Sequence, residues 1–407
     1  MIVRARFLKT CGVPGGDGLV ENAYIAVNAG RIDSLGSVRN GPTHCDVDFQ
    51  DAVILPGLVN AHTHLELTHM HECVPPSPDF TDWLWRLVTH FRANPLDEER
   101  VASSVQRGID LSLASGVTTI GDITREPQLS RPVLSRSPIQ SLSFGEVIAI
   151  GLGRNRLAGK VADAVRSTGD SGRMAVGISP HAPYTIEAEG IECCAAAAKA
   201  QGLRTCMHLL ETPDEEAFTR DASGAYNSYL KRLGVWDEDI PASAVAPVEL
   251  IASCGLLNAE CLLAHMNYVD DKDMARLARS KASVAFCPRT HAAFGHPPHR
   301  FRDMQRAGIN VCIGTDSLAT NPSLSIMDEL RFLHARYHDL SADKLLALGT
   351  INGAVALGMK NTAGVLAPGR PADFAVFSLA TGSDSWESCF ADDRDPLAVL
   401  ANGSFVR

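Results

Sequence analysis

The hydrophobic positions in the middle of the chain form short apolar runs that alternate with longer Ala- and Leu-rich stretches. The short runs have the length and composition of strands, and the stretches between them have the length of helices. Eight such runs follow one another over about 300 residues, which is the pattern of a parallel (β/α)₈ barrel. The predicted strands end near Asn60 and within or at Thr118–Asp122, Ser143–Ile148, Ala175–Ser179, Cys206–His208, Leu263–His265, Val284–Cys287 and Ile313–Asp316.

The two ends of the chain carry a different pattern. Short runs such as Tyr24–Val27 and Asp373–Phe377 are separated by Gly, Pro, Asn and Asp turn residues, which is typical of small β-sheets. We expect residues 1–56 and 363–407 to pair into one composite β-sandwich domain. Residues 57–362 are then the (β/α)₈ catalytic domain, and the fold class is α/β.

Composition narrows the classes of protein. A chain of 407 residues with 45% hydrophobic content can bury a large core and divide into more than one domain. The net charge of −10 and the lack of a Lys/Arg-rich run argue against nucleic-acid binding. The eleven cysteines are odd in number and scattered, which favours free thiols in a reducing compartment, so we expect a cytoplasmic protein. The sequence shows no apolar segment that predicts a signal peptide or a membrane span.

Polar residues with metal-binding chemistry stand where several predicted strands stop. His62 and His64 are two positions apart, so in an extended strand their imidazoles lie on one face and can converge on one divalent ion. Later runs end at His208, His265 and Asp316. Because catalytic residues of a (β/α)₈ barrel collect at the carboxyl ends of its strands, we expect these side chains to meet there.

The same residues belong to a spaced series of motifs that resembles the amidohydrolase superfamily, within it most closely the branch of cytosine/adenosine-type deaminases and triazine chlorohydrolases. The resemblance covers nearly the whole chain. The motifs are Pro56–His64, Ser179–Tyr184, His208–Glu211, Ala264–His265, Cys287–Arg289, Gly314–Ser317 and Gly364–Asp373.

The resemblance implies roles for individual residues. His62, His64, His208 and Asp316 match the family's metal ligands, and Zn²⁺ or Fe²⁺ suits such a shell. Binuclear relatives use a carboxylated lysine after the fourth strand. This chain has Ser179-Pro180-His181 there and no lysine nearby, so we expect one metal ion.

The expected reaction is hydrolytic deamination at an amino-bearing carbon of a heteroaromatic ring, with release of ammonia. A divalent ion lowers the pKa of a bound water toward about 7, and Asp316 and His265 can accept its proton. Glu211, the acid of the family's His-x-x-Glu motif, can protonate the ring nitrogen and then the leaving ammonia. Purines, pyrimidines and nucleosides, including adenosine-like compounds and aminodeoxyfutalosine, are the candidate substrates.

Other residues are candidates for contacts with the small-molecule substrate. They share a position just after a predicted barrel strand or on the connection that follows it, and they are His181, Glu66, Trp83, Arg289 and His291. The long segment 212–258 has the length of a lid or of an insertion that makes a subunit contact, and we expect a homodimer or a higher homo-oligomer.

The motifs also bear on four alternative functions. A cytidine-deaminase fold would need a Pro-Cys-x-x-Cys motif, which does not occur in the sequence. A metalloprotease would need an HExxH motif, and the sequence after His71-Glu72 does not complete it. A catalytically silent scaffold would be favoured by missing ligands, and here none is missing. Hydrolytic dechlorination of a triazine, or another carbon–nitrogen hydrolysis, uses much the same residues and stays open as an alternative function.

Overall fold

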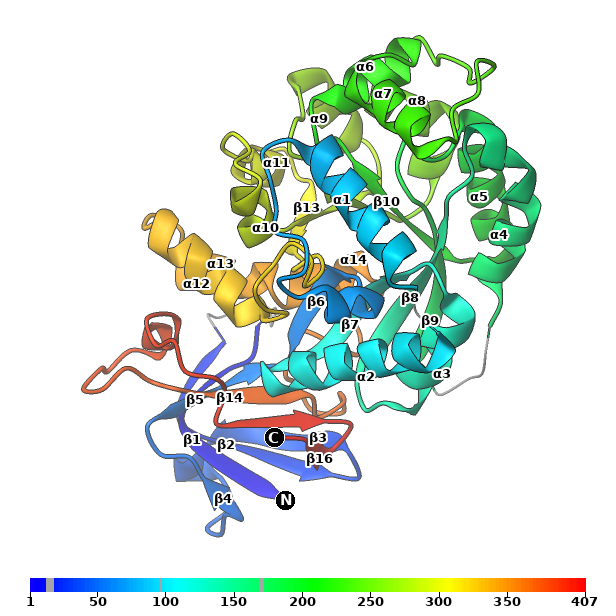
Figure 1. The fold of residues 1–407 in the computed structure, drawn as a ribbon. Helices are drawn as coiled ribbons and strands as arrows, with labels where there is room; N and C mark the ends of the chain where they lie inside the picture. The colour runs from blue at the N-terminus through cyan, green and yellow to red at the C-terminus, as the bar shows by residue number, and fades with distance from the viewer. Residues whose placement is uncertain (12–17, 96, 168–171) are drawn as a thin grey trace.

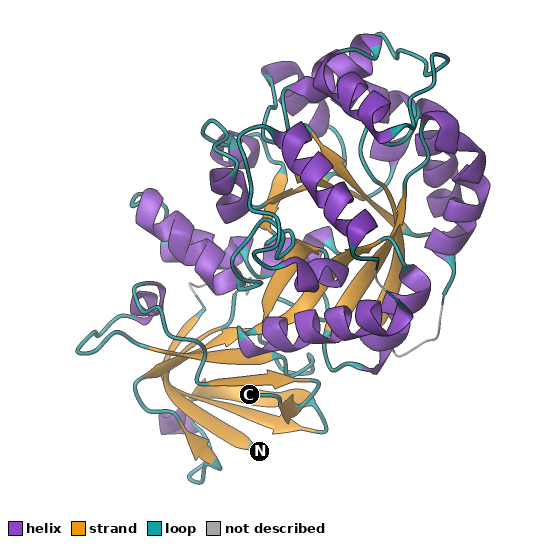
Figure 2. Cartoon of the chain, viewed as in Figure 1, coloured by secondary structure: helices purple, strands orange, loops and turns teal. Residues whose placement is uncertain are grey.

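The structure is a computed structural model that describes residues 1–11, 18–95, 97–167 and 172–407. It consists of a barrel of strands enclosed by helices and of a separate sheet beside one end of that barrel (Figures 1 and 2). Both ends of the chain lie in the separate sheet (Figure 1). No helix within the described ranges is long and apolar enough to cross a membrane.

The barrel follows the order predicted from the hydrophobic pattern. Among the described residues it has eight strands, and each pairs in parallel with the next along the chain. Each predicted strand segment corresponds to one of them, so the predicted α/β barrel class is confirmed. The strands are β6 (Leu58–Thr63), β7 (Val117–Thr124), β8 (Gln140–Val147), β9 (Met174–Pro180), β10 (Arg204–Leu209), β11 (Cys261–His265), β12 (Ser283–Phe286) and β13 (Asn310–Ile313).

Hydrogen bonds between the first and last strands close the barrel. The backbone N–H groups of Thr315 and Asp316 both donate to the His62 carbonyl at 3.1 Å, and Thr63 Oγ1 donates to the Asp316 carbonyl at 2.9 Å. Gly314 permits this approach, because a Cβ at that position would lie 2.7 Å from the His62 carbonyl oxygen. The closure therefore fixes the backbone of two predicted metal ligands.

Helices surround the barrel, and several of them pack an apolar stripe on it. In α2, the fully buried residues Val105 and Ile109 are four positions apart and so lie on one face. The longer helices are α1 (Phe80–Ala93), α2 (Glu98–Ala114), α3 (Pro127–Arg136), α4 (Leu157–Val165), α5 (Ala188–Gln201), α6 (Asp214–Asp221), α7 (Gly224–Leu233) and α12 (Ile326–Arg336). The shorter ones are α8 (Pro247–Ser253), α9 (Asp271–Leu277), α10 (Pro288–Ala293), α11 (Phe301–Arg306), α13 (Ala342–Leu348) and α14 (Ile351–Ala356). Short 3₁₀ helices are η1 (Val38–Asn40), η2 (Leu65–Met70), η3 (Gly151–Arg156), η4 (Leu256–Asn258) and η5 (Trp386–Phe390).

The separate sheet unites the two ends of the chain, as predicted. Its central pair is antiparallel, β5 with β14, and Val53 and Leu55 of β5 face the barrel while Ile54 packs into the core on the other face of the sheet. The sheet order is β16-β15-β14-β5-β1-β2-β3, with β4 beside β1. Its strands are β1 (Ile2–Lys9), β2 (Leu19–Asn28), β3 (Arg31–Ser37), β4 (Val47–Asp48), β5 (Ala52–Pro56), β14 (Phe374–Ser378), β15 (Ala398–Ala401) and β16 (Ser404–Phe405). The predicted boundaries at residues 56/57 and 362/363 stay a prediction.

Candidate metal centre and active site

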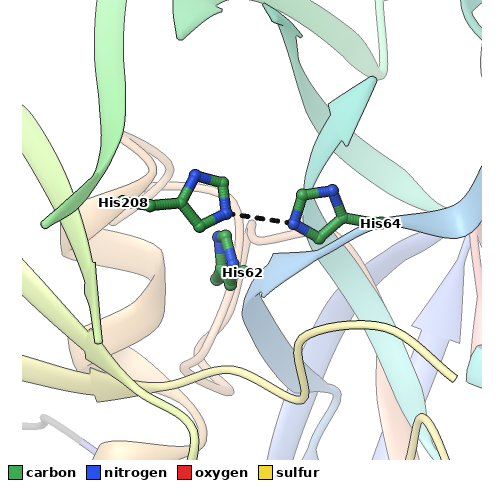
Figure 3. A group of neighbouring side chains, drawn as sticks. All are labelled: His62, His64 and His208. Atoms are coloured by element: carbon green, nitrogen blue, oxygen red, sulfur yellow. Dashed lines mark hydrogen bonds between the residues drawn. The ribbon is translucent and has the colours of Figure 1, made fainter. Parts of the chain in front are cut away.

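Three histidines converge at the carboxyl end of the barrel. His62 lies in β6, His64 follows it, and His208 lies in β10; all three are buried. Figure 3 shows their rings turned toward one another, and the Nε2 atoms of His64 and His208 are 3.2 Å apart. The three side chains can bring their ring nitrogens around one ion.

Asp316 completes the group from the other side of the barrel closure. Its Oδ1 lies 3.8 Å from His62 Nε2 and 3.6 Å from His64 Nε2. Its Oδ2 accepts a hydrogen bond from Thr320 Oγ1 at 2.8 Å, so the carboxylate has a fixed orientation with Oδ1 toward the histidines. The residue has a positive φ of 58°, an uncommon conformation outside glycine that the closing hydrogen bonds hold in place.

The hydrogen bonding of the group fits a divalent metal. Neither ring nitrogen of His62 has a hydrogen-bond partner among the described residues, although both are buried. His208 Nδ1 lies 3.1 Å from the His181 carbonyl, to which it can only donate, so its Nε2 lone pair faces His64. Burial lowers the pKa of His62 and His64 well below the ordinary value and that of His208 to about 4. Neutral imidazoles with a carboxylate are ligands that Zn²⁺ and Fe²⁺ accept.

A carboxyl group and an imidazole lie next to the histidines. Glu211 Oε1 is 3.4 Å from His265 Nε2, and both side chains are buried. Burial, with the nearby charges of Asp316 and Glu215, raises the pKa of Glu211 well above its ordinary value. Burial also raises the pKa of Asp316 to about 7. Carboxyl groups with raised pKa values can hold and release protons near neutral pH, which general acid/base catalysis requires.

The backbone around this pair is held by buried side chains. Glu215 accepts hydrogen bonds from the N–H groups of Leu210 at 2.7 Å and Glu211 at 2.6 Å. His299 Nε2 lies 2.8 Å from the His265 carbonyl and donates to it, and His265 has a φ of 72°. These contacts explain how both groups stay at the end of their strands with little freedom.

A cavity of about 310 Å³ opens beside the histidines. Its inner wall includes His64, Glu66, Glu146 and His181, and its outer walls are largely apolar. Helices α1 and α7 contact each other above it, and they supply Leu84, Leu87, Val88, Phe91, Tyr229, Leu230 and Leu233 to the lining. Arg92, Arg125 and Arg156 also line it. The segment 212–258 thus contributes part of the cavity wall, and its role as a lid or as a subunit contact stays a prediction.

Two of the five predicted substrate contacts line this cavity, and the other three are not among its lining residues. His181 and Glu66 are in the lining, although the Glu66 carboxylate also accepts hydrogen bonds from Thr124 Oγ1 and from the backbone N–H of Arg125. Trp83 donates from Nε1 to the Val74 carbonyl at 3.0 Å and packs on Phe80 and Phe294.

Arg289 and His291 lie after β12, outside the lining residues described for the cavity. The Arg289 guanidinium donates to Ser323 Oγ at 2.8 Å and lies 3.4 Å from an Asp328 carboxylate oxygen. The His291 ring packs edge-on against Phe286. A direct substrate contact by Trp83, Arg289 or His291 stays a prediction.

Two of the lining residues that the sequence analysis does not single out lie at the ends of barrel strands. Glu146 lies near the carboxyl end of β8 and Arg125 follows β7 directly. The signal was available for Glu146, because it is a carboxylate at the end of an apolar run, as Asp316 is. No comparable signal marks Arg125, which follows its strand as an ordinary loop cation.

Curated relatives and solved structures agree with this architecture. A 5-methylthioadenosine/S-adenosylhomocysteine deaminase of Moorella thermoacetica is 27% identical over 386 residues, which covers 91% of this chain and 85% of the relative. The enzyme of the same name from Bacillus cereus strain AH820 is 28% identical over 379 residues, with 88% and 80% covered.

Among solved structures, aminofutalosine deaminase of Helicobacter pylori with methylthio-coformycin superposes with a TM-score of 0.86 at 21% identity, and each chain is covered in full. A zinc-bound adenosine deaminase of Xanthomonas campestris gives 0.81 at 21% identity, with 99% of this chain and 92% of the other covered. At these identities the likeness shows the fold. The sequence itself matches the amidohydrolase family over residues 53–406, and the chain belongs to that family.

Proposed function

We propose that this protein is a metal-dependent hydrolase that deaminates the amino-bearing ring of a purine nucleoside or a close analogue. The observation that carries the proposal is the convergence of His62, His64 and His208 beside the buried pair of Glu211 and His265. The names of the relatives agree with it, because they are deaminases of adenosine-type compounds.

His62, His64, His208 and Asp316 would hold one divalent ion, zinc in the first instance and iron as the alternative. When bound, such an ion lowers the pKa of a water molecule toward about 7 and so supplies a nucleophile at neutral pH. Three imidazoles and one carboxylate would supply four ligands, and the water would be the fifth, a number that catalytic zinc can reach. A single ion is supported by the sequence after β9, where His181 stands and no lysine is nearby.

The side chains around the ion would move the protons of the reaction. Asp316 Oδ1 and His265 Nε2 would accept the proton of the attacking water and orient it. Glu211, whose pKa is raised by burial, would donate a proton to the ring nitrogen next to the reacting carbon. The proton taken from the water would then reach the departing amino group, which leaves as ammonia, and the remaining hydroxyl proton would return to Glu211 as the ring carbonyl forms. The apolar walls from α1 and α7 would hold the ring and exclude other water.

The proposal also covers the location, the binding partners and the oligomeric state of the enzyme. The odd number of scattered cysteines supports a cytoplasmic location, and the acidic net charge supports an enzyme that acts on small molecules rather than on nucleic acid. We propose a homodimer or a higher homo-oligomer as the active form.

A product assay tests the function. Protein loaded with zinc or with iron is incubated with adenosine, 5-methylthioadenosine, S-adenosylhomocysteine, aminofutalosine, cytosine, guanine and atrazine, and both ammonia and chloride are measured. We expect ammonia from at least one purine nucleoside. Chloride from atrazine without ammonia from any purine would instead identify a dechlorinating enzyme.

The number of ions is tested separately. After mild chelation, activity should return fully at one equivalent of metal per chain. A requirement for two equivalents would contradict the single-ion proposal.

A further inference from the structure

Glu146 is a buried carboxylate that the reaction outlined above does not use. It lies at the carboxyl end of β8, is 5% exposed and lines the cavity beside the metal centre. Its Oε1 has no hydrogen-bond partner within the part of the chain that the structure describes. A buried carboxylate oxygen without a donor is costly, so its presence in a binding cavity calls for an explanation.

The neighbour that Glu146 faces is also an acceptor. His181 Nδ1 lies 2.7 Å from Thr185 Oγ1, and the single hydroxyl hydrogen of Thr185 is donated to the Ala182 carbonyl at 3.0 Å. Thr185 must therefore accept from His181, which places the ring hydrogen on Nδ1 and leaves a lone pair on Nε2 in the neutral ring. That Nε2 lies 3.8 Å from Glu146 Oε1, too far for a direct hydrogen bond.

A second metal ion is the less favoured occupant of the space between these two acceptors. The third nearby ligand, His208, turns its Nε2 toward His64 and donates from Nδ1 to the His181 carbonyl. Glu146 and His181 alone would supply two ligands, fewer than protein sites for transition metals provide. The positive charge of Arg125 also acts on both groups and opposes a cation there.

We propose that Glu146 is a specificity-determining residue which, together with His181 Nε2, accepts hydrogen bonds from O–H or N–H groups of the substrate. This inference rests on the proposed function. The ring centres of His181 and of the proposed metal ligand His208 are 4.8 Å apart. The paired acceptors therefore lie directly beside the metal centre. They would meet either a second amino group on the heterocycle or a hydroxyl of a sugar attached to it. Compounds without such a donor leave the buried Glu146 Oε1 unpaired and are selected against.

The test compares substrates that differ only in the donor, in wild-type protein and in Glu146→Gln. The hydroxyl arm uses a ribonucleoside with its 2′-deoxy and 3′-deoxy counterparts, and the amino arm uses a 2-aminopurine nucleoside with its unsubstituted counterpart. In wild type, removal of the recognised donor should lower kcat/KM about 10- to 100-fold. In Glu146→Gln that difference should shrink to about threefold or less, mostly through KM, and the arm that responds identifies the donor.

The exposed residue Glu126, which is outside the lining residues described for the cavity, offers the matched control, because Glu126→Gln makes the same change of charge without touching the acceptor pair and should keep the full discrimination. If Glu146→Gln folds poorly, Thr185→Val tests the same pair by removing the acceptor that fixes the His181 hydrogen, and it too should weaken the discrimination.

Calorimetry separates the two proposals. In a Glu211→Gln background, which suppresses turnover, each compound of a pair is titrated into protein with and without Glu146→Gln. Failure of the wild type to release ammonia from any purine contradicts the proposed function. No preference for the donor-bearing compounds, whether because both bind equally or because neither binds, overturns the role of Glu146. Equal discrimination in wild type and Glu146→Gln overturns it as well.

Discussion

Two groups of basic side chains lie at the carboxyl ends of barrel strands, and they differ in what their nitrogen atoms face. The rings of His62, His64 and His208 turn toward one another, and both His62 nitrogens lack a partner among the described residues. The second group, named here the strand-seven group, consists of Arg289, His291, His296 and His299.

In the strand-seven group, several nitrogens are bonded to the protein itself. His299 Nε2 bonds to the His265 carbonyl, His296 Nδ1 lies 3.0 Å from the Tyr268 hydroxyl, and Arg289 bonds to Ser323. Both groups contain histidines that follow a barrel strand, and the strand-seven group also has two buried nitrogens without a partner among the described residues, His291 Nε2 and His299 Nδ1. Within the described ranges these two do not belong to a group of three converging metal-binding side chains. The difference teaches that convergence of unpartnered nitrogens, rather than a histidine at a strand end, indicates a metal site.

The largest expected effect comes from removing a converging ring. His208→Ala removes one of the four proposed ligands and leaves two histidines and Asp316. The variant should therefore lose both the metal and the activity. Metal content is measured by elemental analysis after gel filtration, and activity by ammonia release. Retention of one full equivalent of metal in the variant would contradict the ligand role of His208.

The next effect separates the proton carrier from the ligands. Glu211→Gln should keep the metal and fold normally, yet turn over about 10²- to 10⁴-fold more slowly, as is typical of general acid/base groups. The measurement is kcat at saturating substrate with metal content checked in the same sample. Normal turnover would refute the assignment.

A smaller effect on kcat is expected from His299, the member of the strand-seven group that is hydrogen-bonded to His265. His299→Ala removes the donor to the His265 carbonyl, and the freer His265 should lower kcat by about tenfold, in the range seen for residues that orient active-site groups. The conservative variant His299→Gln, which can still donate, should recover most of the loss. Equal losses in both variants would point to packing of the ring on Phe286 instead.

The smallest effect is expected at Arg289. Its contacts with Ser323 and Asp328 favour a structural contribution, so Arg289→Ala should lower the melting temperature by a few degrees, equivalent to about 1–2 kcal/mol. The substrate contact predicted from the sequence would appear as a higher KM on the identified substrate. Steady-state kinetics and thermal unfolding of the same preparation distinguish the two outcomes.

The parts of the molecule that local sequence determines were predictable. Each barrel strand is a short apolar run, and His62, His208, His265 and Asp316 each stand at the end of a run or one to three residues beyond it. Such positions need no knowledge of distant partners, because the parallel topology itself brings strand ends together.

The side-chain partners could not be predicted in the same way. Arg289 meets Ser323 and Asp328, which are 34 and 39 positions away, and its sequence neighbours give no sign of them. Trp83 is held by the Val74 carbonyl on a loop of irregular path. The apolar run around Glu146 predicts a strand, and it does not by itself indicate that this carboxylate lines a cavity.

The closure of the barrel has a consequence for folding. Thr63 and Asp316, whose hydrogen bond helps to join the first strand to the last, are 253 positions apart, so almost the entire barrel must be assembled before the ligand groups of the two strands meet. A partly folded chain offers the paired histidines of β6 without the carboxylate. An ion that binds the finished site and not the incomplete one stabilises the closed barrel in proportion to the logarithm of its concentration. If the proposed ion binds in this way, its supply sets the free energy of unfolding of the completed fold as well as its ability to react.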